Sequence, residues 1–455
     1  MILLKGVKFV FQNIGVKSMK KLNFNQFNEP WIKHMVSSKE FILNQGATLK
    51  MQNFMEKYDS SLPTLPIPLV IERDCYETIC QASNLLIKAQ FKIIRFLMSV
   101  HSQEEILEMF NLNPSIKSLV DWNELEKREG IIGRFDIIPT NNGYQFCEIN
   151  ADSETGGLKL FDCFQEFGDS LGWSYPNEDN SPRKNVAKYL HEVVLKHKFQ
   201  RVIIFSAKKY LSDGSGTVKS LFNCVVDAIP EVPVLLLDEE NYPEELLNSV
   251  ENKKTLLYRM ALYNDVDFHP LLARIFDSGA TIINKFETEI RSNKKWFAIF
   301  HDPKYQNILT ELERSAILQF VPRSFVLSSE NFESLLKDKD RYVFKLNRSY
   351  AGSGVYIGAD NETEFLRRTL SDFNKWTVQE IVDCQDLWLP EDETFITKPH
   401  KVVLGLFHAL DKQSGILVRV NKKVRVINMS HGTKIGWAFP CSIEEREHLM
   451  RHIAS

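Results

Sequence analysis

Residues 134–157 read RFDIIPTNNGYQFCEINADSETGG, and they carry charged and amide side chains at the spacing of a β-strand. Arg134 and Asp136 lie two residues apart, as do Glu148 and Asn150. Residues two apart in a strand point to the same face of a sheet. The stretch therefore predicts a hairpin in which each polar pair shares one face.

The turn of this hairpin decides whether the two pairs share the same face. Asn141-Asn142-Gly143 is a strong turn signal, because glycine readily takes the positive φ of a tight hairpin. A two-residue loop would put the pairs on opposite faces, whereas a three-residue loop puts all four polar groups on one face. The three-residue loop pairs Thr140 with Tyr144, Asp136 with Glu148, and Arg134 with Asn150. We expect this loop, since it leaves the other face apolar with Phe135, Ile137, Cys147 and Ile149.

The paired carboxylates of this face suggest a cation site. Two carboxylates directly opposite one another repel, so such a pair normally needs a cation between them. Asp, Glu and Asn oxygens are hard ligands that suit Mg²⁺, which takes its remaining ligands from substrate phosphates and water. Alternating polarity is also the commonest strand pattern, so a hairpin with its polar face in water is an equally good alternative from spacing alone.

Composition sets the protein class. The 455 residues correspond to two or three domains, and 44% hydrophobic with 25% charged residues is ordinary for a globular protein. A net charge of -3 gives no indication of a nucleic-acid partner. The seven cysteines show no zinc-site spacing, and their odd number argues against a full disulfide framework. We therefore expect a cytoplasmic protein.

The first 21 residues contain short apolar runs interrupted by Lys5, Lys8 and Gln12. We expect neither a signal peptide nor a membrane anchor there, and Met19 is an alternative start. No run elsewhere approaches the ~18 apolar residues of a membrane helix. The sequence therefore predicts no membrane partner.

The middle of the chain predicts helices followed by a small parallel sheet. Apolar residues recur at helical spacing over 72–100, and Ser102 to Glu105 has the spacing of a capping box. Short β-rich runs at 202–206 and 232–237 alternate with helical patterns at 218–228 and 243–250. The GSGT at 214–217 lacks the Walker lysine arrangement, so an ordinary surface turn is the preferred interpretation over a phosphate loop.

The last third adds basic strands and a glycine-rich loop. Residues 343–357 predict a strand with Lys345, a loop with glycines, and a second strand; such a loop lets backbone N–H groups approach phosphate. Residues 376–382 form another β run with Gln379 and Glu380, and 416–426 predict a hairpin bearing Arg419. Each could equally be an antiparallel sheet with exposed basic positions.

Taken in order with Ser292-Asn293-Lys294, these motifs resemble the circularly permuted ATP-grasp ligases. The resemblance covers roughly residues 70–435 and is strongest to the synthetase domain of glutathionylspermidine synthetase. It implies a mixed α+β and α/β fold: an ATP-grasp core, a small Rossmann-like domain and an N-terminal helical segment. The implied segments are an extension and connector (1–68), a helical segment with the metal-binding hairpin (69–183), the small α/β domain (184–290) and the ATP-binding part (291–455).

The resemblance also implies roles for individual residues. Mg²⁺ would be bound by Asp136, Glu148 and Asn150, and two ions are expected. ATP phosphates would be held by Lys294, with Lys295 as the neighbouring alternative, by Lys345, and by a covering loop of Ala351, Gly352, Ser353 and Gly354. Adenine would meet Gln379, Glu380, Ile381 and Val382. The transferred phosphoryl group would contact Arg134 and Arg419. The resemblance identifies no general base; Asp152 and Glu154, on the loop after the hairpin, are our candidates.

The implied activity is ATP-dependent amide formation. The γ-phosphoryl group passes to a carboxylate, an amine attacks the resulting acyl phosphate, and ADP and phosphate leave. Cations and positioning carry such chemistry, so no protein nucleophile is needed. Implied partners are a small-molecule or peptide carboxylate and an amine, such as an amino acid or polyamine. Two alternatives stay open: a degenerate nucleotide-binding module, and a kinase whose phosphorylated compound is the final product.

Overall fold

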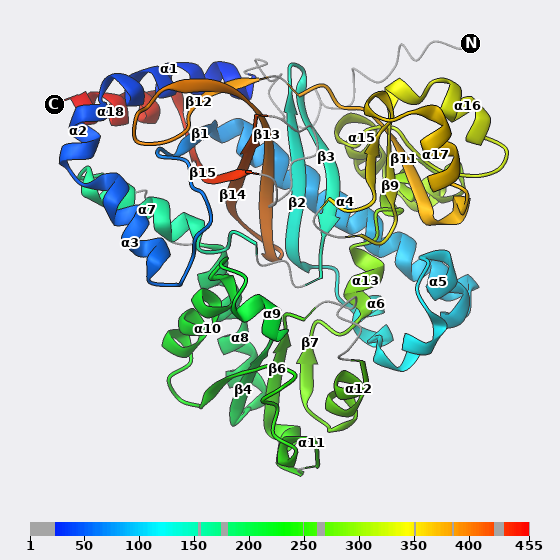
Figure 1. The fold of residues 1–455 in the computed structure, drawn as a ribbon. Helices are drawn as coiled ribbons and strands as arrows, with labels where there is room; N and C mark the ends of the chain where they lie inside the picture. Colours follow the sequence, from blue (N-terminus) through cyan, green and yellow to red (C-terminus); the bar gives the residue numbers. More distant parts are fainter. Residues whose placement is uncertain are drawn as a thin grey trace.

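The computed structural model describes residues 23–152, 156–173, 181–248, 250–261, 269–349, 352–384, 386–422 and 432–454. The chain is a mixed α/β protein with three sheets, as Figure 1 shows. The mixed class predicted from the sequence is therefore confirmed. The division of the chain at residues 68, 183 and 290 stays a prediction.

The largest sheet has seven strands and is antiparallel except where β1 runs parallel to β15. Its spatial order is β1 (Leu69–Glu72), β15 (Lys434–Cys441), β14 (Lys412–Asn421), β13 (Thr397–Leu410), β2 (Ile131–Thr140) and β3 (Gly143–Asn150), with β12 (Leu387–Pro390) paired to β13. Arg419 lies on β14, which pairs with both neighbours, while residues 423–426 of the predicted hairpin lie outside the described residues.

Helix α4 (Arg73–Val100) packs against this sheet and confirms the helix predicted over 72–100. Its buried face includes Ile79, Leu86 and Ile93, which recur at the seven-residue spacing of one helical stripe. The predicted capping box begins α5 (Gln103–Met109), with both reciprocal bonds between Ser102 and Glu105 formed. No helix within the described ranges is long and apolar enough to cross a membrane.

Further helices surround the central sheet (Figure 1). At one side, the first described helices pack near the last helix and α7: α1 (Phe24–Ser37), α2 (Lys39–Asn44), α3 (Ala47–Glu56), α7 (Leu160–Ser170) and α18 (Ile443–Ala454). Short helices link the other sheets to α4: α6 (Trp122–Lys127), α13 (Glu287–Arg291), α14 (Trp296–His301) and α15 (Glu311–Phe320).

The second sheet is small and fully parallel, as predicted, in the order β5-β4-β6-β7. Its elements are β4 (Arg201–Phe205), β5 (Val234–Leu237), β6 (Thr255–Arg259), β7 (Thr281–Ile283), α8 (Pro182–His197), α9 (Lys208–Leu211), α10 (Thr217–Ala228), α11 (Glu245–Asn248) and α12 (His269–Asp277). Its first strand, β4, lies between the second and third. The chain passes from β4 to β5 on one side and then to β6 on the other side of β4. The carboxyl ends of β4 and β6 therefore form a topological switch point.

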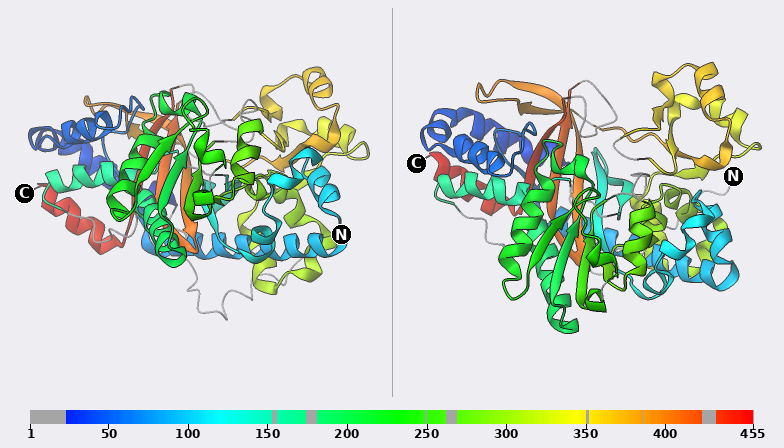
Figure 2. Two further views of the ribbon diagram at one scale, coloured as in Figure 1. Left: turned by 90° about the horizontal axis from the view of Figure 1, so that it is seen from below. Right: turned by 60° about the horizontal axis from the view of Figure 1, so that its bottom comes forward.

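The third sheet is antiparallel, in the order β10-β9-β11-β8, and has its own hydrophobic core. Its elements are β8 (Ser324–Val326), β9 (Tyr342–Leu346), β10 (Val355–Ile357), β11 (Trp376–Glu380), α16 (Phe332–Lys337) and α17 (Thr363–Thr369). Figure 2 shows this lobe on the opposite side of the central sheet from α1 to α3. The strand predicted around Lys345 is confirmed, and the strand predicted over 376–382 is confirmed for 376–380.

The β2–β3 hairpin has two of the three predicted pairs but not the predicted loop, and Tyr144 pairs with Pro139 instead of Thr140. Thr140 pairs with Gly143, so the loop has two residues, and the expected three-residue loop is wrong. The register then shifts by one residue at Cys147, a β-bulge. Because of this shift Asp136 still pairs with Glu148, and Arg134 with Asn150.

Candidate active site

The three sheets meet around a cavity of about 920 Å³. This size suits a site for small molecules. One part of its wall comes from the hairpin and β14, a second from the β8–β11 lobe, and a third from loops at the edge of the small parallel sheet. Most of the predicted site residues line it: Arg134, Asp136, Glu148, Asn150, Lys294, Lys345, Gly352, Gln379, Glu380, Ile381, Val382 and Arg419.

Asp136 lies between two arginines. Arg134 Nε donates to Asp136 Oδ1 at 2.8 Å, and Arg419 Nη2 lies 2.6 Å from Asp136 Oδ2. Burial raises the pKa of Asp136, but the charges of Arg134 and Arg419 outweigh it and lower that pKa to about 2. The carboxylate is therefore ionised, and the two guanidinium groups predicted to meet a phosphoryl group are held side by side at its two oxygens.

Lys294 joins the hairpin to the third sheet. Its Nζ lies 2.8 Å from Glu148 Oε1 and donates to Ser349 O at 2.5 Å. Lys295 Nζ instead donates to Met109 O at 2.6 Å, away from this cavity wall. Of the two adjacent lysines, Lys294 is therefore the one that faces the predicted phosphate position.

Lys345 is held by the bulge of the hairpin. Its Nζ donates to the backbone oxygen of Cys147 at 2.9 Å and to Gln379 Oε1 at 2.7 Å. Cys147 lines the cavity, so its predicted place on the core face is wrong. An extra residue in one strand re-aims its neighbouring groups, which is why bulges occur next to active sites. Here the bulge presents a carbonyl to a lysine of another sheet.

The glycine loop is described only in part. Gly352 has φ +76° and lines the cavity, while Ala351 lies outside the described residues. Gly354 has φ +65°, and an added Cβ would lie 2.7 Å from Leu346 Cβ, so glycine is required there. Gly354 O accepts from Leu346 N at 2.8 Å, which closes the loop, and Ser353 directly precedes Gly354. That this loop covers phosphates stays a prediction.

The chemistry of the donor set fits Mg²⁺. Asp136, Glu148 and Asn150 all line the cavity and offer hard oxygen ligands. Asn150 Nδ2 is buried without a partner among the described residues. In the described ranges, no group of three or more His, Cys, Asp or Glu side chains could hold a metal ion, so the donor set here is two carboxylates and one amide. Both carboxylates are paired with cations, and those pairs must open for a metal.

Gly405 is a site residue that we did not predict. It lies on β13 opposite Asp136, and an added Cβ would come within 2.5 Å of Arg134 Cδ and 2.9 Å of Arg134 Nε. Arg134 passes across this gap, with its guanidinium 5.8 Å from the centre of the Phe407 ring. No motif surrounds Gly405, and only its strand partners reveal its role.

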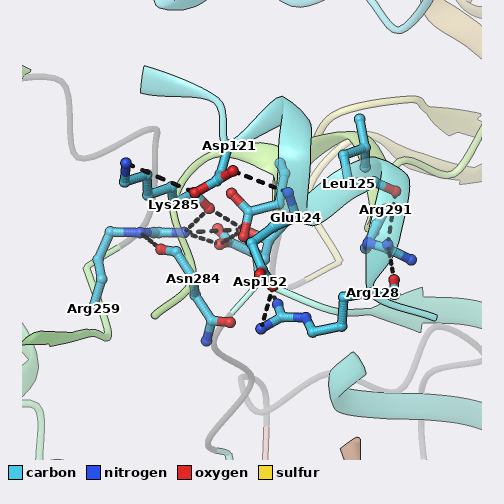
Figure 3. Close-up of polar contacts among 11 residues, drawn as sticks. Asp121, Glu124, Leu125, Arg128, Asp152, Arg259, Asn284, Lys285 and Arg291 are labelled. Carbon is cyan, nitrogen blue, oxygen red and sulfur yellow. Dashed lines mark hydrogen bonds and ion pairs between the residues drawn. The ribbon is translucent and has the colours of Figure 1, made fainter. Parts of the chain in front are cut away.

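Asp152, a candidate general base, belongs to a buried ionic network (Figure 3). Its Oδ1 accepts from Arg259 and from Thr288 Oγ1. Arg259 is fully buried, and its guanidinium packs 4.7 Å from the centre of the Phe286 ring. One carboxylate oxygen of Asp152 is therefore committed to structure. The other candidate base, Glu154, lies outside the described residues.

The loop at 214–217 is more than the ordinary surface turn we expected. Ser215 and Thr217 line the cavity, and Thr217 begins α10. Gly216 has φ +62°, and an added Cβ would lie 2.1 Å from Tyr58 O. Lys159, which is buried, donates to Ser215 O. The loop is thus fixed at the cavity wall.

The fold resembles that of a glutathione synthetase-like effector from Globodera pallida, with a TM-score of 0.56 and 12% sequence identity. The likeness covers 91% of this chain and 98% of that one. A putative gamma-glutamylcysteine synthetase from Methylobacillus flagellatus gives a TM-score of 0.38 at 10% identity, over 81% of this chain and 94% of that one. No protein-family model and no curated protein matches the sequence. The chain is therefore similar in fold to a glutathione synthetase-like protein.

Proposed function

We propose that the protein is an ATP-dependent carboxylate–amine ligase of the circularly permuted ATP-grasp type. The observation that carries this proposal is the meeting of three separate groups in one cavity. The Asp136/Glu148 hairpin comes from the central sheet, Lys345 comes from the third sheet, and Lys294 connects them through Glu148 and Ser349. The likeness to a synthetase-like fold supports the same conclusion.

In this function ATP lies along the third sheet. Lys345 and Lys294 hold its phosphates, and 379–382 lines the part of the cavity that takes adenine. Arg134 and Arg419 stabilise the charge on the transferred phosphoryl group as it passes to the carboxylate. Mg²⁺, when bound by Asp136, Glu148 and Asn150, supplies further charge neutralisation.

The test uses Asp136→Ala and Glu148→Ala. Both variants should lose Mg²⁺-dependent ADP formation in a screen of carboxylates and amines. Each removes a proposed Mg²⁺ ligand and also the carboxylate that positions a site cation: Arg134 and Arg419 for Asp136, and Lys294 for Glu148. Lys92→Ala, which breaks a Lys92–Glu313 pair (2.8 Å) in which neither residue lines the cavity, is the control and should keep activity. Full turnover in both site variants contradicts the proposal. Mass spectrometry of the product separates an amide from a phosphorylated compound, which would indicate a kinase.

A second candidate is a nucleotide-binding module that does not ligate. It is favoured by the closed ion pairs, since Asp136 is held at both oxygens and Glu148 is held by Lys294. Calorimetry that shows ATP binding, together with no turnover across the substrate screen, would select this candidate.

A further inference from the structure

One end of the cavity lies at the topological switch point of the small parallel sheet. Ser206 directly follows β4, Met260 directly follows β6, and both line the cavity. Met260 N donates to Phe205 O at 2.7 Å, so the two strand ends are in contact. In open parallel sheets, the crevice beside the carboxyl ends of strands at such a point is where ligands bind. We call this part of the cavity the switch-point end.

Two buried polar atoms at the switch-point end lack partners. Asp152 is 4% exposed and Ser206 is 0% exposed, and both line the cavity. Asp152 Oδ2 and Ser206 Oγ have no hydrogen-bond partner within the described ranges. Leaving a buried polar group unpaired costs about 1–3 kcal/mol, so such groups call for a specific explanation. A bound ligand that donates hydrogen bonds explains both atoms.

Arg259 binds Asp152 through Oδ1, and its nitrogens have other acceptors as well, so Arg259 does not donate to Asp152 Oδ2 (Figure 3). The acceptors of its three nitrogens are Asn284 O for Nε, Ala261 O for Nη1, and Asp152 Oδ1, Lys285 O and Thr288 Oγ1 for Nη2. This network fixes the carboxylate through Oδ1. It leaves Oδ2 without a partner among the described residues.

Charge is unevenly distributed along the cavity. The centre and the nucleotide end carry cations: Arg134, Lys294, Lys345, Lys401 and Arg419. The lining of the switch-point end includes the carboxylates of Asp152 and Asp213 and no described Lys or Arg; Arg259 pairs with Asp152 and Lys159 donates to Ser215 O, but neither of these two cations lines the cavity. Phosphates and a substrate carboxylate are therefore attracted to the centre, whereas the charged groups that line the switch-point end are carboxylates, which suit an ammonium group.

We propose that the switch-point end holds the amine substrate, with Asp152 Oδ2 accepting a hydrogen bond from its ammonium group and Ser206 Oγ contacting the same group. This assignment rests on the proposed ligase function and places the amine across the cavity centre from ATP. It makes Asp152 a substrate-binding residue, and it commits the ligand to the class of small primary amines.

Ligand-observed NMR of the full chain tests this assignment in the absence of ATP. Three probes of equal length are compared: propylammonium, 1-propanol and propionate. Propylammonium should show saturation transfer that weakens by roughly fivefold or more in Ser206→Ala and Asp152→Asn, the effect of about one lost hydrogen bond. Propanol should show little transfer. Any propionate signal should depend on Arg419 and not on Asp152.

Matched controls keep the test independent of folding. Asp162→Asn also weakens a buried ion pair, because Asp162 Oδ2 accepts from Arg183 Nε at 2.7 Å, but neither residue lines the cavity. Ser278→Ala removes a serine whose hydroxyl caps Ile275 O outside the cavity. Both controls should keep propylammonium transfer, and circular dichroism checks the fold of every variant.

The outcomes separate the two proposals. Equal propylammonium transfer in the native protein, Asp152→Asn and Ser206→Ala overturns the amine site. Amine binding lost in those variants, with no ADP formation from any substrate pair, supports the amine site and contradicts the ligase. In an active ligase, Ser206→Ala should raise the KM for the amine and leave the KM for ATP unchanged.

Discussion

Gly405 gives the most specific prediction about the site, because the three atoms nearest to an added methyl group all belong to Arg134. In Gly405→Ala the new Cβ would lie 2.5 Å from Arg134 Cδ, well inside normal contact, so the arginine must move. The Arg134 Nε to Asp136 Oδ1 bond of 2.8 Å is then lost. A charge-assisted bond of this kind contributes about 1.5–3 kcal/mol. We expect a loss of about 3 kcal/mol in unfolding free energy once overpacking strain is included.

Two assays measure this effect. Urea unfolding at pH 7 gives the free energy of unfolding. ADP release gives kcat/KM, which should fall about 100-fold, because a displaced Arg134 no longer makes a charge-assisted bond of about 1.5–3 kcal/mol to the transferred phosphoryl group in the transition state. Gly168→Ala is the control: its Cβ would lie 2.8 Å from Trp173 O at the end of α7, and neither residue lines the cavity. It should lose stability and keep kcat/KM. Unchanged turnover in Gly405→Ala would refute the role given to Arg134.

Two further predictions concern charge. Lys294→Met should abolish ADP formation. Lys295→Met should lower the melting temperature and keep turnover, since Lys295 Nζ donates to Met109 O at 2.6 Å and Lys295 does not line the cavity. ADP release and thermal melts separate the two variants. The pKa of Asp136 in the folded protein, about 2, lies below its ordinary value of 3.8. The ionised carboxylate therefore contributes fully to the free energy of unfolding above pH ~4, and this contribution is lost as the pH falls toward ~2. The difference in unfolding free energy between the native protein and Asp136→Asn should shrink by about 2 kcal/mol over that interval.

Local sequence rules predicted the elements that carry the site. Periodicity predicts the apolar stripe of α4 and the strand β4 of the parallel sheet, and cap chemistry predicts the capping box at Ser102. The structure has all three. The polar face of the hairpin was also predicted, for a partly wrong reason. A three-residue loop in a regular ladder and a two-residue loop with a bulge place Asp136 and Glu148 opposite one another in the same way, so polarity alone cannot distinguish them.

Contacts between distant segments could not be predicted in this way. The choice between Lys294 and Lys295 depends on Lys294 N donating to Asn347 O at 3.1 Å, which fixes the backbone of the pair against the third sheet. Gly405 matters only because Arg134 crosses it, and Asp152 is committed only because Arg259 is buried beside it. These partners lie more than 50 residues apart in the chain, beyond the reach of spacing or propensity.

The bulge at Cys147 offers a last test of how the hairpin serves the site. Deleting Cys147 leaves Glu148 directly after Phe146, which pairs with Ile137, so Glu148 still falls opposite Asp136 and the ladder becomes regular. The deletion removes the carbonyl that accepts from Lys345 Nζ at 2.9 Å. We therefore expect the fold and the Asp136–Glu148 pair to survive, while ATP affinity falls at least about tenfold, the effect of one charged hydrogen bond of about 1.5 kcal/mol or more.

Cys147→Ser separates the backbone of the bulge from its side chain. It keeps the extra residue and the carbonyl, so calorimetry should give the ATP affinity of the native protein. Burial raises the pKa of the Cys147 thiol to about 12, so the native side chain is a neutral group whose loss moves no charge. Equal ATP affinity in the deletion and in Cys147→Ser would show that Lys345 is positioned by Gln379 alone. Weaker binding in the deletion only would show that the bulge supplies the contact between the two halves of the site.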